Sequence, residues 1–195
     1  MRPPVYAVDL HRTYTVYTRQ VALTRERIAS AALDVAEREG PAALGIRRVA
    51  RELEVTPMAL YRYVESKEGL IDVVRGSLYE RLDVQSPRST SWREELRELA
   101  RAFRRLVREL PAAPALMAGG NGESEEERRI CDLMLRSFRR AGFDAETAEI
   151  LYLQFSHFVL ALVRLDAEER SGERDGFELG LELFLGGVAR LPRKP

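Results

Sequence analysis

The residues best suited to chemistry gather in one short stretch, VTPMALYRYVESKEGL, which runs from Val55 to Leu70. It places two tyrosines, an arginine and a lysine close together, behind a proline that suits the first turn of a helix. Hydroxyl groups and cations can bind the phosphates of a nucleic acid, and arginine and apolar side chains can contact base edges. We therefore expect a surface for double-stranded DNA, formed by Thr56, Pro57, Met58, Tyr61, Arg62, Tyr63 and Lys67.

Two short helices would have to hold this surface. The first is expected over residues 46–53 and the second over about 57–63, with a turn at residues 54–56 between them. Two helices joined in this way form a helix-turn-helix, whose second helix lies in the major groove of DNA. Tyr61 is expected to contact DNA, whereas Tyr63 could equally cover the linker that follows.

The rest of the chain has the apolar spacing of α-helices and almost no strand-like alternation. Thr24 is expected to cap a first helix that ends at Gly40, and Ser66 is expected to cap a fourth helix. The later helices are expected at residues 92–110, 123–143, 144–168 and 175–191. The sequence thus predicts an all-α protein with about nine helices.

The clearest linker is VQSPRSTS, residues 84–91, which is polar and interrupted by a proline. It separates a three-helix helix-turn-helix domain with its following helix (residues 24–83) from a C-terminal helical bundle (residues 84–195). Residues 1–23 form an N-terminal arm, in which Arg2, Arg12 and Arg19 could enter a minor groove; disorder or a mis-assigned start are equal alternatives for this segment.

Residues 24–82 resemble the DNA-binding domain of regulators of the tetracycline-repressor (TetR) family. The matching features are Gly40 after the first helix, the run Arg47–Ala50, the sequence LYRYV in the third helix and S-K-E-x-L at the start of the fourth. The resemblance implies that Arg47 meets a base or a phosphate, and that Tyr61, Tyr63 and Lys67 contact the DNA backbone.

The sequence departs from the pattern of this family at three positions. Gly45 and Ile46 stand where hydroxyl residues are usual, so no side-chain cap is expected at the start of the second helix. Glu54 stands where a turn glycine is common.

The C-terminal part resembles the tetracycline-repressor class of regulatory domain, which implies a ligand-binding bundle that dimerises through its last two helices. The residues support a homodimer independently, because helix 144–168 is apolar on two faces and must be buried on both. Three glycines in the last helix also favour close packing, since each costs about 1 kcal/mol there. The expected dimer interface consists of Leu153, Leu160, Phe177, Gly180, Leu181, Phe184, Gly187 and Val188.

A pocket for a small-molecule effector follows from the resemblance more than from the residues. Apolar and aromatic side chains at helical spacing are also what an ordinary core would contain. His157 has no second histidine or carboxylate cluster to complete a metal site, so neither a metal nor a cofactor is expected. The candidate pocket residues are Phe103, Leu116, Met117, Met134, Phe138, Tyr152, Phe155 and His157.

Composition excludes little. The chain has 195 residues and a formal net charge of zero, so charge alone does not indicate nucleic-acid binding. A single cysteine, Cys131, cannot form an internal disulfide, and no apolar run is long enough for a membrane span, so we expect a cytoplasmic protein. Glycine-rich phosphate loops, nucleophile elbows and zinc-protease motifs are missing, and an enzyme is not expected.

Three hypotheses about function remain open at this stage. The first is a repressor that binds a near-palindromic operator as a dimer and is released by a small, largely apolar effector. The second is a TetR-like DNA-binding protein without such an effector. The third, from another class, is a helical enzyme or carrier that reuses the fold.

Overall fold

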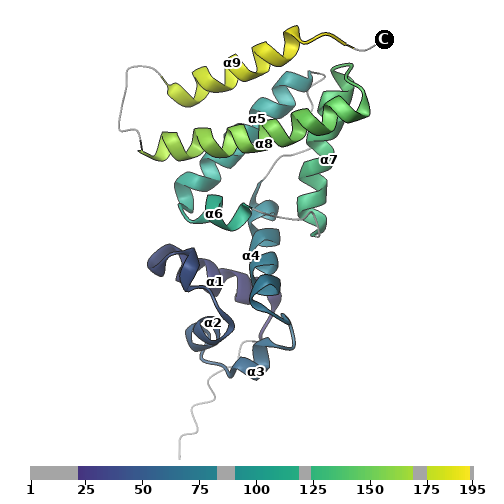
Figure 1. The fold of residues 1–195 in the computed structure, drawn as a ribbon. Coiled ribbons are helices and arrows are strands. Elements are labelled where there is room, and N and C mark those ends of the chain that lie inside the picture. The colour runs from purple at the N-terminus through teal and green to yellow at the C-terminus, as the bar shows by residue number, and fades with distance from the viewer. Residues whose placement is uncertain (1–21, 83–90, 119–123, 169–174, 194–195) are drawn as a thin grey trace, which may run out of the picture.

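The computed structural model describes residues 22–82, 91–118, 124–168 and 175–193 of the chain. In these ranges all regular structure is helical, with nine α-helices and one 3-10 turn (Figure 1), which confirms the all-α prediction. The linker and nearly all of the N-terminal arm lie outside the described residues. The elements are α1 (Arg25–Glu39), η1 (Pro41–Ala43), α2 (Ile46–Glu52), α3 (Pro57–Leu60), α4 (Lys67–Arg81), α5 (Trp92–Glu109), α6 (Ala113–Met117), α7 (Glu125–Arg140), α8 (Ala145–Glu168) and α9 (Gly176–Arg190).

Helix α4 joins the two halves of the molecule. It packs against α1 in the N-terminal half and against α6 and α7 in the C-terminal half (Figure 1). Its buried stripe consists of Leu70, Val74 and Leu78 and continues to Leu82, and each of these residues is at most 2 % exposed. One cluster of buried apolar residues therefore extends through both halves.

The helix ends follow the sequence rules for capping. The hydroxyls of Thr24 and Ser66 accept hydrogen bonds from backbone N–H groups three residues on, at 3.3 and 3.1 Å, so both expected caps are confirmed. Helix α2 begins after Gly45 without a side-chain cap, as expected. Gly40 has φ +85°, a conformation that glycine adopts easily, and it lets the chain turn out of α1.

Helix α8 is the central helix of the C-terminal half. By length and composition alone, Ala145–Ala167 could cross a membrane, with a mean hydropathy of 1.3. One such helix is weak evidence, because the core helix of a globular protein passes the same test. Here α8 packs against α5, α7 and α9, and it places Phe155 and Val159 in the core.

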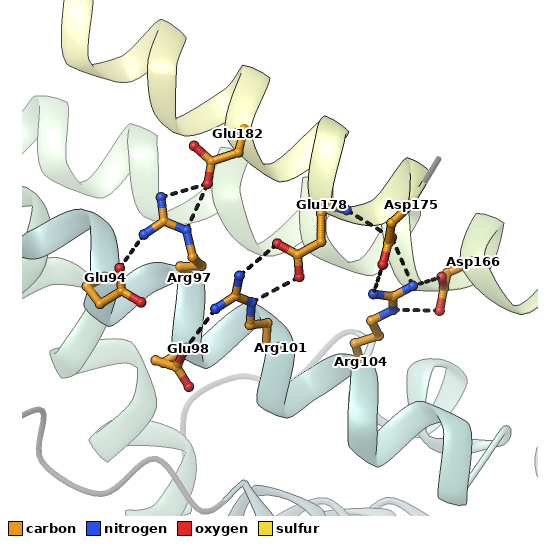
Figure 2. A network of polar contacts seen from close by, with 9 residues as sticks. All are labelled: Glu94, Arg97, Glu98, Arg101, Arg104, Asp166, Asp175, Glu178 and Glu182. Carbon is orange, nitrogen blue, oxygen red and sulfur yellow. Dashed lines mark hydrogen bonds and ion pairs between the residues drawn. The ribbon is translucent and has the colours of Figure 1, made fainter. Parts of the chain in front are cut away.

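A ladder of ion pairs fixes α9 against α5 (Figure 2). Arg97 donates a hydrogen bond of 2.8 Å to Glu182, and Arg101 donates two hydrogen bonds, of 2.9 and 3.0 Å, to Glu178. Two-point pairing of this kind fixes orientation as well as distance. The ladder therefore sets the rotation of α9 about its own axis.

Arg104 forms the last rung of the ladder. It donates to Asp175 at 2.7 Å and to Asp166 at the end of α8 at 2.9 Å, and its guanidinium lies 4.5 Å from the centre of the Phe177 ring. These hydrogen bonds hold the pKa of both carboxyl groups below the usual value for aspartate. One arginine on α5 thus anchors the end of α8 and the start of α9.

Strain is present in the turn between α2 and α3. Glu54 has φ +55°, in the left-handed region that side chains with a Cβ atom disfavour. At this position a glycine is common in the family that the N-terminal half resembles.

We predict that Glu54→Gly stabilises the protein by about 0.5–1 kcal/mol, because relief of the strain exceeds the extra chain entropy of glycine. Thermal unfolding should show a rise of about 1–4 °C in Tm. Arg51→Gly, in the exposed last turn of α2, is the matched control and should lower Tm. A fall in Tm for Glu54→Gly would contradict the assignment of strain to this turn.

Candidate functional site

The helix-turn-helix presents most of the expected DNA-binding residues on its surface. Pro57 opens α3, and the Thr56 hydroxyl caps it by accepting a hydrogen bond from the Ala59 N–H at 3.3 Å. Met58 is 73 % exposed and Tyr61 is 48 % exposed, although a surface methionine gains nothing from water. The other exposed members of the set are Arg47, Thr56, Pro57, Arg62 and Lys67.

The cations of this surface have no protein partners. Arg47, Arg62 and Lys67 form no ion pair with any residue in the described ranges. The neighbouring Arg48, in contrast, binds Glu39 at 3.0 Å and Glu52 at 2.9 Å, and these bonds raise its pKa above the usual value for arginine. Two glutamates of the chain thus neutralise Arg48, whereas the adjacent Arg47 can bind an anion from outside the protein.

The two tyrosines of the surface differ. Tyr61 projects into solvent, whereas Tyr63 is half-buried and packs against the core. Leu60, directly before Tyr61, is fully buried and anchors α3. Tyr63 therefore has a structural role in the protein, whatever contact it makes with DNA.

A cavity of about 280 Å³ lies between α4, α5, α7 and α8, with the end of α6 at its side. Six of the eight residues expected to form a pocket line it: Phe103, Met117, Met134, Tyr152, Phe155 and His157. The other two, Leu116 and Phe138, are buried elsewhere in the core, and Phe138 packs between the rings of Trp92 and Phe155.

Several polar groups of the cavity were not foreseen from the sequence. Cys131 Sγ lies 3.1 Å from the Tyr152 hydroxyl, and burial raises the pKa of both groups. Burial also raises the pKa of Tyr79, which lines the cavity from α4. Glu127 completes this set from α7. The sequence predicts a DNA-binding domain over residues 24–83, and this domain boundary places Tyr79 outside the expected pocket.

The glycine-based part of the expected dimer interface needs a correction. A Cβ atom on Gly180 would lie 2.7 Å from a methyl carbon of Leu162, so this glycine permits close packing of α9 on α8 within one chain. Phe177, Leu181 and Val188 are also buried inside the chain, between 0 and 5 % exposed. These four residues belong to the protomer core and not to a face open to a partner.

The exposed apolar residues on α8 and α9 lie on other faces of the same helices. On α8 they include Ile150, Leu153 and Leu165, each at least half exposed. On α9 they are Leu179 and Leu183, each one residue after a glutamate that the ladder directs towards α5. Of the residues expected at the interface, Leu153 and Gly187 are exposed, whereas Leu160 and Phe184 are half-buried.

Metal chemistry finds no support in the described ranges, since no group of three or more histidine, cysteine, aspartate or glutamate side chains could hold an ion. The ring Nδ1 of His157 lies 2.8 Å from the Leu153 carbonyl oxygen, an ordinary contact within a helix.

Comparison with known families matches both halves of the chain. A family model described as "Bacterial regulatory proteins, tetR family" matches residues 28–74, which contain the helix-turn-helix. A second model, described as "Tetracyclin repressor-like, C-terminal domain", matches residues 86–176.

Individual proteins show the same relationship. An HTH-type transcriptional regulator of Saccharopolyspora erythraea is 26% identical over 159 residues, which cover 79% of this chain and 65% of the relative. The chain therefore spans less than two thirds of the length of this curated relative.

Two solved structures that are similar to this chain contain a bound ligand. BioQ, a protein of Mycobacterium smegmatis, in complex with its double-stranded DNA operator is 26% identical, with a TM-score of 0.72 over 86% of this chain and 99% of that chain. A TetR variant from Acinetobacter baumannii AYE in complex with minocycline is also 26% identical, with a TM-score of 0.74 over 87% of this chain and 98% of that chain.

Proposed function

Because the chain belongs to the tetR family of bacterial regulatory proteins, we propose that it is a transcriptional repressor which binds a near-palindromic operator as a homodimer. In this proposal a small, largely apolar effector enters the cavity and releases the DNA. Such a repressor acts in the cytoplasm, where the chromosome is. The observation that carries the proposal is the exposed helix-turn-helix surface, on which Arg47, Arg62 and Lys67 form no ion pair with any described residue.

DNA binding is supported by the contrast between Arg47 and Arg48. Unpaired cations beside exposed hydroxyl and apolar side chains are what phosphates and thymine methyl groups require. The Thr56 cap leaves its own hydroxyl hydrogen free to be donated to a phosphate oxygen. BioQ, which has the same fold, is solved with its operator.

Dimerisation is supported by the open apolar faces of α8 and α9. Only 28% of the most apolar window of α8 is buried inside one chain, although this helix lies at the centre of its half. Apolar patches of this kind on a globular protein indicate an interaction surface. A second copy, related by a two-fold axis, would cover the same face on both chains and place two α3 helices on successive major grooves.

Effector control is supported by the position of the cavity beside α4. Tyr79 and Leu82 line the cavity, and the same helix packs against α1 of the DNA-binding half. Arg75 of α4 also donates to the Leu116 carbonyl oxygen of α6 at 3.3 Å. A ligand that favours one placement of α4 over another would therefore shift α3 on the DNA, by as much as its affinities for the two states differ.

We predict that Lys67→Ala weakens binding to all DNA sequences alike and lowers the salt slope by about one, as expected for one lost phosphate contact.

We also predict that Arg47→Ala weakens the free energy of DNA binding by about 1–3 kcal/mol, and that it relaxes sequence preference if the arginine reads a base. Fluorescence anisotropy with DNA from upstream of the gene for this chain measures both effects. Arg48→Ala is the matched control and should leave affinity nearly unchanged. Wild-type affinity in folded Arg47 and Lys67 variants would contradict the proposed orientation.

We predict that Leu183→Glu separates the dimer and leaves the protomer folded, because Leu183 is 68 % exposed in the single chain. An unpaired charge in an apolar interface should raise the dimer dissociation constant at least tenfold, or about 1.4 kcal/mol. Sedimentation measures assembly, and circular dichroism measures folding.

Met58→Glu makes the same change on the exposed surface of α3 and should leave the dimer intact. Leu181→Glu, in the core, should instead unfold the chain. A Leu183→Glu protein that remains a tight dimer would place the interface elsewhere.

A further inference from the structure

A buried carboxylate lines the cavity and has no partner among the described residues. Glu127 is only 5 % exposed, and it lines the cavity from the first turn of α7. Within the described ranges, its carboxylate makes no hydrogen bond or ion pair with another group. Every fully enclosed side-chain oxygen in these ranges has a partner. The oxygens of Glu127 must therefore open onto the cavity.

The second buried glutamate of the C-terminal half shows the usual arrangement. Glu95 is as buried as Glu127, but it accepts a hydrogen bond of 2.6 Å from the Ser137 hydroxyl and pairs with Arg140. Burying a charged group is costly unless it is paired and hydrogen-bonded. Glu127 thus lacks the compensation that Glu95 has.

The groups around Glu127 are neutral or already engaged. Tyr79, Tyr152 and Cys131 lie within its field, which adds to the effect of burial in raising the pKa of each, so they stay protonated at neutral pH. Arg75, one turn before Tyr79, directs its guanidinium to Asp72 at 2.6 Å and to the Leu116 carbonyl oxygen. Among the described residues, no cation forms an ion pair with the carboxylate.

The N-terminus of α7 engages the backbone of Glu127 and not its carboxylate. The N–H of Glu127 donates to the Ser124 hydroxyl at 3.0 Å, and the helix dipole favours a negative charge in this first turn. This stabilisation uses the backbone of Glu127 and leaves the lone pairs of its carboxylate directed into the cavity.

From this arrangement we propose that the effector carries a cationic nitrogen, which binds Glu127, on an aromatic or aliphatic body that fills the apolar part of the cavity. This inference rests on the proposed function, because it names the chemical class of the effector. Phe103, Phe155 and Met134 provide the apolar walls, and the Tyr79 and Tyr152 rings lie beside the charge, where an aromatic face attracts a cation. A cavity of about 280 Å³ is at the small end of ligand pockets and suits a compact amine.

Three naphthalene probes of similar shape test this inference: (2-naphthylmethyl)trimethylammonium, its neutral carbon isostere 2-neopentylnaphthalene, and the anion 2-naphthylacetate. Binding to the full-length protein is measured by thermal shift and by naphthalene fluorescence. The cation should bind at least tenfold more tightly than the neutral isostere, and the anion should bind least. Glu127→Gln, which keeps the shape and removes the charge, should abolish the preference for the cation. Glu125→Gln removes an exposed charge from the same helical turn and should leave the preference unchanged.

The inference is overturned if the cation does not bind, if the neutral isostere binds equally well, or if Glu127→Gln keeps the preference for the cation. Each of these outcomes is distinct from failure of the proposed function. A neutral or anionic ligand that released operator DNA would retain the repressor and reject the cationic effector. Failure of the folded dimer to bind any upstream DNA would reject the repressor itself.

Discussion

The packing of α4 into both halves of the molecule is the constraint on which the rest of the structure depends. Leu70, Val74, Leu78 and Leu82 are buried along this helix, which packs against α1 in one half and against α6 and α7 in the other. Because protein interiors are close-packed, such a helix cannot move at one end without strain at the other. The DNA surface and the cavity are thus two ends of a single packed element.

Ion pairing elsewhere in the chain decides which surfaces remain open. On α2, Arg48 pairs with Glu39 and Glu52, whereas Arg47 forms no ion pair with the part of the chain that the structure describes. On α9, the α5 ladder turns the glutamates inwards and so turns Leu179 and Leu183 outwards. In both cases one residue is paired within the chain and the residue next to it is exposed. The open members of each pair form the surfaces proposed for DNA and for a second copy.

Much of this could be predicted from the sequence where the evidence was local. Helix periodicity and the Thr24 and Ser66 caps are set by neighbours in the chain, and the structure agrees with each. The rotation of α9 could not be predicted, because it depends on arginines about 80 residues away. Gly180 was therefore assigned to a dimer seam when it packs on α8. The unpaired Glu127 was missed for the same reason, since its burial depends on α4 and α8.

A substitution that fills the cavity tests the coupling through α4 without an identified effector. Ser156→Trp directs a large ring from α8 into the cavity, and Arg136→Trp places the same ring on the exposed side of α7, away from the apolar faces proposed for a second copy. The measurement is the dissociation constant for the upstream operator DNA, determined on folded dimers of both variants. The account predicts that Ser156→Trp weakens DNA binding at least tenfold while Arg136→Trp binds like the wild type. Equal affinities for the two variants would contradict the claim that the cavity controls the DNA surface.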